Sequence, residues 1–270
     1  MSEVYRYSVP KHFYGKRRRK FRKMRILAGK NALFLNSCFN YRSQRSARLA
    51  FQRFFQLPFD LKRMDASIVR MDKPNEFLNR AVNEAVETLQ SLHQLERQVE
   101  QAANLIEECL CAGNKLLVCG NGGSAADASH FATEFVVRFM RERPAYPAIC
   151  LAGDGGLLSA VGNDYGFEEL FARQVAAFGL PGDVLVCLTT SGKSRNIERA
   201  LQEAKSRKVK TISFLGRDGG STIGMADVDL LVRGNLTSRI QEAHQLLLHV
   251  LCEIVEVRLI EKKHGQKTLG

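Results

Sequence analysis

Long apolar runs and paired cysteines are both missing from this 270-residue sequence. No apolar run approaches the ~20 residues that a membrane-spanning helix needs, so the sequence predicts no membrane partner. The seven cysteines are an odd number with no CxxC pair, and several stand inside apolar runs, as buried reduced thiols do. We therefore expect a reducing compartment, most simply the cytoplasm.

Acidic residues are scarce at the start of the chain. Residues 1–70 hold 18 Lys and Arg against three acidic residues, a net charge of +15, whereas residues 71–270 hold 22 against 25, a net charge of −3. A nucleic-acid-binding protein is expected to carry its positive charge on a face of the folded domain. Because this excess lies in residues 1–70, the overall charge of +12 is no evidence that the body, residues 71–270, binds nucleic acid. The body is long enough for one α/β domain.

The basic N-terminal extension, residues 1–70, has three interpretations. Its basic run Lys16–Lys20 and its many aromatic residues fit an arm that binds nucleic acid or an anionic surface. Its arginine-rich, acid-poor composition, without the apolar core of a secretory signal, also fits a transit peptide. The sequence favours the third, a segment that is disordered or not native, with translation starting at Met64 or Met71, because Pro74 then stands in the first turn of a helix.

Short apolar runs alternate with helical patterns along the body. The runs predict strands at Lys115–Cys119, Pro147–Leu151, Asp183–Thr189, Lys210–Leu215 and Val228–Val232. The helical patterns cover about Asn75–Cys111, Ala125–Met140, Phe167–Ala177, Arg195–Lys208 and Ser238–Glu261. This alternation predicts a doubly wound, five-stranded parallel sheet with helices on both faces. The last helix is apolar nearly all round, so we expect it to pack in an oligomer interface as well as on its own sheet.

A glycine-rich loop, Gly120–Ser124 (GNGGS), stands directly after a predicted strand and before a helix. In open α/β sheets, anions bind at such helix N-termini, and glycines let the backbone come close to them. The spacing is not GxGxxG, so a dinucleotide site is not favoured. A simple tight turn would need fewer glycines, and the pattern therefore predicts a binding loop.

A hydroxyl-rich turn, Thr189–Ser194 (TTSGKS), occupies the same position after another predicted strand. Its end mimics a Walker A loop, but the required first glycine would fall at Cys187, which excludes that motif. A helix cap needs only one hydroxyl residue, and here there are four. The turn predicts a pocket for a phosphate monoester held by hydroxyls and backbone N–H groups.

Two further groups could carry chemistry. His130 and Glu134 are four residues apart on the helix that follows the glycine-rich loop, so they share one face and could bind a metal or do acid–base work. Taken alone, such a pair is more typical of a surface couple. The final helix offers Gln241, His244 and His249, and on this feature alone solvated or buried structural side chains are the favoured interpretation.

Taken together, these residues resemble the sugar isomerase (SIS) domain family and, within it, the phosphoheptose isomerases, over about residues 75–260. The matching segments are Gly120–Ser124 with Asp127, His130–Glu134, Arg143-Pro144 with Tyr146–Ala148, Val161–Phe167, Thr190–Gly192 with Ser194 and Asn196, and Arg239–Glu242 with His244 and His249. The resemblance implies a flavodoxin-like fold and an isomerase that converts sedoheptulose 7-phosphate to D-glycero-D-manno-heptose 7-phosphate. That reaction begins the route to the heptose of bacterial lipopolysaccharide.

The resemblance also implies a site. Substrate contacts would come from Asn121, Gly122, Gly123, Ser124, Glu134, Arg138, Asn163, Asp164, Thr189, Thr190, Ser191, Ser194 and Gln241. Glu134 and His249 would be the acid–base pair, which moves a proton between adjacent carbons through an enediol. One zinc ion per subunit would be held by His130, Glu134, Gln241 and His249, and the family forms tetramers with sites shared between subunits.

Helix geometry sets a condition on that zinc site. Gln241 and His249 are eight residues apart, which is ~12 Å along a helix axis. Either long side chains converge, or the two ligands come from different subunits. His244, one turn from Gln241, is the competing ligand within the same helix.

Two alternatives to the enzyme remain open. Non-catalytic SIS proteins that resemble the DnaA-initiator-associating proteins share the glycine-rich loop but lack the glutamate that Glu134 matches, so the presence of Glu134 favours the enzyme. A sugar-phosphate sensor with the basic extension on nucleic acid is the other. Ser238 stands where some family members carry an aspartate, which leaves the substrate's hydroxyl contacts open.

Overall fold

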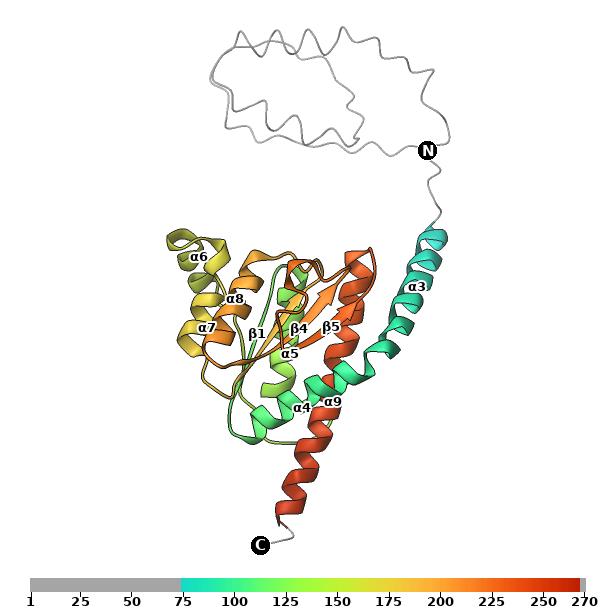
Figure 1. The fold of residues 1–270 in the computed structure, drawn as a ribbon. Helices are drawn as coiled ribbons and strands as arrows, with labels where there is room; N and C mark the ends of the chain where they lie inside the picture. Colours follow the sequence, from blue (N-terminus) through green and yellow to red (C-terminus); the bar gives the residue numbers. More distant parts are fainter. Residues whose placement is uncertain (1–73, 268–270) are drawn as a thin grey trace, which may run out of the picture. The chain divides into compact units, whose positions relative to one another are not determined.

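The computed structural model describes residues 74–267, with side chains as far as Lys262, so the interpretations of residues 1–70 lie outside the described residues (Figure 1). The elements in order are α3 (Pro74–Gln90), the 3₁₀ helix η3 (Ser91–Leu95), α4 (Glu96–Cys111), β1 (Leu116–Gly120), α5 (Gly123–Val136), β2 (Ala148–Cys150), α6 (Gly155–Asp164), η4 (Phe167–Glu169), α7 (Ala172–Phe178), β3 (Val184–Thr189), α8 (Arg195–Ser206), β4 (Lys210–Gly216), η5 (Gly220–Thr222), β5 (Val228–Val232) and α9 (Thr237–Lys267).

The five strands form one parallel sheet in the order β2-β1-β3-β4-β5, which confirms the predicted fold class. β1 and β3 pair along their whole length, from Leu116 opposite Val184 to Gly120 opposite Leu188. Every residue of these two strands is buried. Strands covered on both faces show continuous apolar runs, which is why the sequence marked them clearly.

Helices cover both faces of the sheet (Figure 1). On one face α4, α5 and α9 pack on the side chains of Leu116 and Val118 from β1 and of Phe214 from β4. On the other, α6, α7 and α8 pack on Leu117 and Cys119. Alternate residues of one strand thus enter two separate cores, as the two-residue period of a strand requires.

Three predicted helices differ from the observed ones, among them Phe167–Ala177, which is divided into η4 and α7, and one observed helix was not predicted. The predicted single helix Asn75–Cys111 is divided by η3, where the hydroxyl of Ser91 donates to the backbone carbonyl of Thr88 and so competes with the helix ladder. α5 ends at Val136 rather than Met140, where the side chain of Arg143 donates hydrogen bonds to the backbone carbonyls of Glu134 and Phe135. α6 was not predicted, since its first residues are glycines; Asp154 caps it by accepting from the N–H groups of Gly156 and Leu157.

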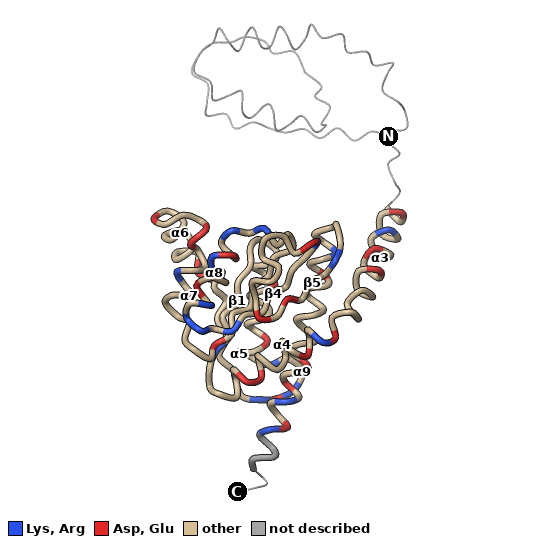
Figure 2. Tube along the Cα trace, in the orientation of Figure 1, with Lys and Arg blue, Asp and Glu red and all other residues tan. Residues whose placement is uncertain are grey.

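Charged residues of both signs are interspersed along the described chain (Figure 2). This mixture agrees with the small net charge of the body. Within residues 74–267, no helix is both long enough and apolar enough to cross a membrane.

Candidate active site

The sheet reverses its winding between β1 and β3, because β1 leads to β2 on one side and β3 leads to β4 on the other. In sheets of this order, ligands bind outside the carboxyl ends of the strands at this point. The glycine-rich loop follows β1 and the hydroxyl-rich turn follows β3, so the fold brings the two predicted loops together. Asn121 and Asn196 join them: each side-chain amide donates to the oxygen of the other, at 3.0 and 2.9 Å.

The glycine-rich loop needs glycine at two positions. Gly122, just before α5, has a φ of 57°, in the left-handed region that favours glycine. A Cβ atom on Gly120 would lie 2.4 Å from the backbone oxygen of Ser124. The N–H of Ser124 donates to the carbonyl of Asn121 at 3.1 Å and closes the turn. The result is a tight loop whose backbone an anion can approach closely.

The hydroxyl-rich turn is held by its own side chains. Thr189 Oγ1 accepts from the N–H of Gly192 at 3.2 Å and lies 3.3 Å from the hydroxyl of Ser194. Ser191 Oγ accepts from the N–H of Lys193 at 3.2 Å. Ser194 is the N-cap residue of α8, but its hydroxyl makes no capping hydrogen bond. These hydroxyls therefore stabilise the turn rather than the end of the helix, and their contact with a phosphate stays a prediction.

A histidine pair joins α5 to α9. The Nε2 atoms of His130 and His249 lie 2.9 Å apart, and the two rings meet edge to face. Glu134 Oε1 lies 3.5 Å from the same His130 nitrogen. The ring of Phe139 stacks on His249 with centroids 5.5 Å apart and planes at 28°. Three of the predicted site residues thus converge at one place, two turns along α5 from the glycine-rich loop.

Gln241 lies at the other end of this helix pair, against the glycine-rich loop. Its side-chain amide occupies the space that a Cβ on Gly123 would need. Burial raises the pKa of Asp127, and a hydrogen bond from Gln241 and the charge of His130 act in the opposite direction. One oxygen of Asp127, Oδ2, is buried without a protein partner. Gln241 therefore lies against the glycine-rich loop, with a hydrogen bond to Asp127.

The predicted zinc ligands are consequently split within one chain. His130, Glu134 and His249 supply nitrogen and oxygen donors of the kind that zinc takes, whereas Gln241 stands two turns of α9 away, beside Gly123. Gln245, one turn before His249, is the nearer glutamine, with its Nε2 3.3 Å from His249 Nε2. Across the described residues, no group of three or more His, Cys, Asp or Glu side chains is arranged so that it could hold a metal ion. The four-ligand set does not fit zinc within a single chain.

His244 is not part of this site. Its side chain is fully buried, packs edge to face on Phe214, and has its Nε2 3.0 Å from the backbone oxygen of Leu215. Burial lowers the pKa of His244 from 6.5 to about 4, so the ring is neutral. The competing ligand considered from helix spacing is a core histidine.

The remaining predicted residues lie on the surface, near the ends of α5 and α6. Arg138 follows the end of α5, is about half exposed (51%), and has its Nε 3.8 Å from a carboxylate oxygen of Glu142. Asn163 and Asp164 close α6, where the Asn163 amide donates to Asp164 at 2.8 Å on the surface. Their contact with a substrate stays a prediction.

Sequence reasoning assigned no role to three residues that touch the site. Asp127 and Asn196 appeared only inside the matching segments, although a polar residue in an otherwise buried helix turn is a usable signal. Phe139 has no such signal, because it stands in an irregular segment and reaches His249 only through the packing of that segment on α9. The tertiary structure reveals this contact, and the spacing of residues in the sequence does not.

The comparison with protein families assigns this fold. The family model described as "SIS domain" matches residues 80–216, about half of the chain, and includes both loops and Glu134. The chain belongs to the SIS domain family. The match to the SIS domain ends with β4, so Gln241 and His249 on α9 lie beyond it.

Similar proteins and solved structures narrow the assignment within this family. This chain is 49% identical over 169 residues to the phosphoheptose isomerase of Citrifermentans bemidjiense. The aligned segment covers 63% of this chain and 88% of the relative. Among solved structures, the phosphoheptose isomerase from Neisseria gonorrhoeae is 41% identical, with a TM-score of 0.65, and 68% of this chain covers all of it. The one from Francisella tularensis is 38% identical, with a TM-score of 0.66, and 68% of this chain covers 99% of it. Within the SIS domain family, the chain is thus a member of the phosphoheptose isomerases.

Proposed function

We propose that this chain isomerises sedoheptulose 7-phosphate to D-glycero-D-manno-heptose 7-phosphate. The observation that carries the proposal is the convergence of Glu134 and His249 at the seam between α5 and α9, in a chain of this family. A ketose–aldose isomerisation needs one base that removes a proton from carbon and one acid that protonates the carbonyl oxygen. A carboxylate and an imidazole meet those two needs.

The phosphate end of the substrate suits the hydroxyl-rich turn. Thr189, Thr190, Ser191 and Ser194 offer hydroxyls, and the first turn of α8 offers backbone N–H groups to an anion. The sugar end suits the glycine-rich loop, with Asn121, Gly122, Gly123 and Ser124, and Gln241 beside it. Arg138, Asn163 and Asp164 complete the proposed substrate contacts. Binding of the anion by neutral groups agrees with the small net charge of the body.

The proton transfer assigns one role to each partner. Glu134 takes the proton from the carbon next to the ketone, while His249 gives a proton to the carbonyl oxygen, which yields an enediol. Glu134 then returns its proton to the neighbouring carbon, and the new carbonyl forms as its hydroxyl proton passes back to His249. The exchange leaves both side chains as they began, so the reaction needs no redox cofactor.

We also propose one zinc ion per subunit, held by His130, Glu134, Gln241 and His249. The donor types support zinc, but the position of Gln241 beside Gly123 means that one chain does not close the set. Gln241 from a neighbouring subunit, or a rearrangement on binding, would supply the fourth ligand. A bound zinc would polarise the carbonyl oxygen of the sugar in place of the proton from His249, which would then act as a ligand.

The assembly and compartment follow the same proposal. We expect a homotetramer with sites shared between subunits, as the resemblance to the family implies. We expect the enzyme in the cytoplasm, because its cysteines are buried, reduced thiols where the structure describes them, apart from Cys111 and the half-buried Cys150. Light scattering of the purified full chain measures the assembly.

The test of the function is turnover of sedoheptulose 7-phosphate by the full chain. Glu134→Gln should lower kcat at least a thousandfold, because the amide accepts no proton from carbon. Glu108→Gln, a change in an exposed carboxylate of α4, is the matched control and should keep normal turnover. Normal turnover by Glu134→Gln would refute the assignment, and binding of a replication initiator without any turnover would support the non-catalytic alternative.

A further inference from the structure

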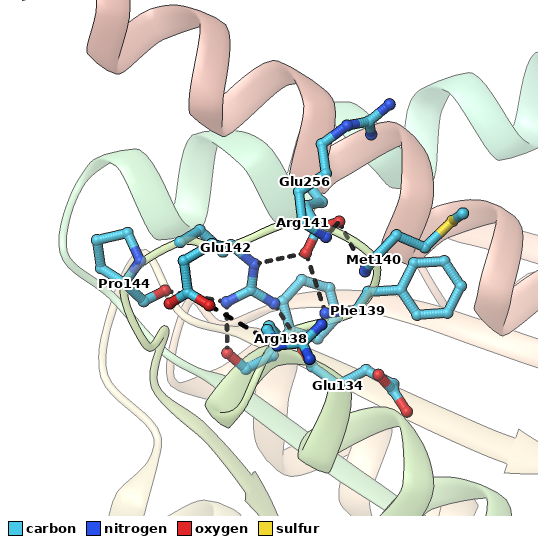
Figure 3. A network of polar contacts seen from close by, with 10 residues as sticks. Glu134, Arg138, Phe139, Met140, Arg141, Glu142, Pro144 and Glu256 are labelled. Carbon is cyan, nitrogen blue, oxygen red and sulfur yellow. Dashed lines mark hydrogen bonds and ion pairs between the residues drawn. The ribbon is translucent and has the colours of Figure 1, made fainter.

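A buried ion pair lies behind the histidine pair. Arg143 and Glu256 have side chains only 3% and 1% exposed, and Arg143 Nε lies 3.1 Å from Glu256 Oε1. Figure 3 shows Glu256, on α9, facing the segment that follows α5. Removing two charges from water costs free energy that their attraction recovers only when further hydrogen bonds satisfy the remaining atoms. The partners of this pair therefore indicate what it holds in place.

Glu256 holds the segment after α5. Its Oε1 accepts from the N–H of Phe139 at 3.0 Å, and its Oε2 accepts from the N–H groups of Met140 and Arg141, both at 2.9 Å (Figure 3). Burial alone would raise the pKa of Glu256, but these three N–H groups and the charge of Arg143 together bring the pKa below its ordinary value. The carboxylate is thus ionised and fully hydrogen-bonded.

Arg143 holds the end of α5. Its guanidinium donates to the backbone carbonyls of Glu134 at 2.5 Å, Phe135 at 2.9 Å and Pro144 at 3.0 Å. The last carbonyl groups of a helix have no donor within the helix. Arg143 supplies that donor at the residue whose side chain is the proposed base.

Phe139 links the ion pair to His249. Glu256 and His249 are seven residues apart, two turns of α9, so they lie on one stripe of the helix about 10 Å apart. The backbone of Phe139 is bound at Glu256, and its ring stacks on His249. The segment therefore spans from the buried carboxylate to the imidazole.

We propose that Arg143 and Glu256 are a positioning pair for the isomerase, which holds the backbone of Glu134 and, through Phe139, the ring of His249. This inference rests on the acid–base roles proposed above for Glu134 and His249. Both members of the pair are buried away from solvent, and Glu256 reaches the imidazole through Phe139. A pair that only stabilised the fold would leave kcat unchanged in variants that stay folded.

The first test changes the ring and keeps its backbone hydrogen bond. Phe139→Leu in the full chain should lower kcat about tenfold while KM for sedoheptulose 7-phosphate stays within twofold, because the phosphate loops are untouched. Phe139→Tyr keeps an aromatic ring and should restore kcat to within twofold of the wild type. Normal kcat in Phe139→Leu, or equal loss in both variants, would overturn the proposal.

The second test changes the pair itself. Glu256→Gln should lower both kcat and the melting temperature. The matched control is Glu107→Gln, which removes the charge of another buried carboxylate, 2.5 Å from Lys262 and 3.5 Å from Arg258, and should lower the melting temperature without changing kcat. A folded Glu256→Gln with normal kcat would overturn the proposal, and if this variant does not fold, the two Phe139 variants decide.

A spectroscopic measurement separates this inference from the proposed function. In the wild type, Phe139→Leu, Glu256→Gln and Glu107→Gln, the ring resonances of His249 are read by NMR. The first two variants should shift them, since the stacked ring is lost or displaced, and Glu107→Gln should not. Lack of turnover by the wild type would contradict the function alone, whereas unshifted resonances would contradict the positioning.

Discussion

Gln241 lies directly against Gly123, so that a Cβ atom at position 123 would come within 2.3 Å of Gln241 Nε2 and 2.6 Å of its Oε1. The contact is between a backbone position on α5 and the far end of a flexible side chain on α9. A side chain at position 123 would therefore displace Gln241 without breaking the backbone. We therefore expect glycine at this position to matter for the site more than for the fold.

Gly123→Ala should separate activity from stability. Alanine displaces Gln241 from the loop, so kcat/KM should fall at least tenfold, or about 1.4 kcal/mol of transition-state stabilisation. Stability should not fall, because alanine is favoured over glycine in a helix by about 1 kcal/mol. Steady-state kinetics and urea unfolding measure the two effects. Gly155→Ala at the start of α6, where a Cβ meets nothing within 4 Å, is the control, and equal kinetics in both variants would contradict the prediction.

Thr222→Val should weaken phosphate binding from outside the pocket. The carbonyl of Gly192 accepts from the N–H of Thr222 at 3.1 Å, and the Thr222 hydroxyl lies 3.1 Å from the same oxygen. Valine keeps the shape and removes the hydroxyl, a change of about 1 kcal/mol. KM for the sugar phosphate should rise about fivefold with kcat nearly unchanged, and Thr222→Ser should restore it. An unchanged KM for Thr222→Val would show that the turn holds its shape without this bond.

The buried His244 predicts a loss of stability in acid. Its pKa is near 4 in the folded chain and 6.5 when exposed, so between these values the unfolded chain binds the extra proton. The free energy of unfolding should therefore fall as pH is lowered from 6.5 to 4, by about 2–3 kcal/mol from this residue. Urea unfolding of wild type and His244→Leu at several pH values isolates the difference. Parallel curves for the two proteins would contradict it.

Zinc removal should abolish turnover if the proposed metal site forms. The purified full chain should contain one zinc per subunit by elemental analysis and lose it, with its activity, to a chelator; added zinc should restore both. His249→Ala should contain no zinc, because a ligand is lost. His93→Ala, a change in an exposed histidine of η3, should keep one zinc per subunit. Full turnover by the metal-free protein would remove zinc from the mechanism.

The sheet and the two loops could be predicted from residue types that are close together in the sequence. Strands buried on both faces must be apolar throughout, so β1 and β3 were visible as runs, and glycines or hydroxyls at their ends marked the binding loops. Helix boundaries were less visible. Ser91 ends a helix through a side-chain hydrogen bond, and α6 begins with glycines capped by Asp154, features that periodicity does not register.

The amino-acid sequence by itself determined the parallel sheet, the position of Gly120–Ser124 and Thr189–Ser194 after β1 and β3, and the face that His130 and Glu134 share. Only the tertiary structure decided which histidine of α9 meets them. His249 reaches His130 and His244 turns into the core, because the packing of α9 on α5 and on the sheet selects between the two faces of one helix. The same packing set Gln241 beside Gly123 and the ion pair of Arg143 and Glu256 behind the site, since contacts between residues more than 100 positions apart depend on how elements dock rather than on local spacing.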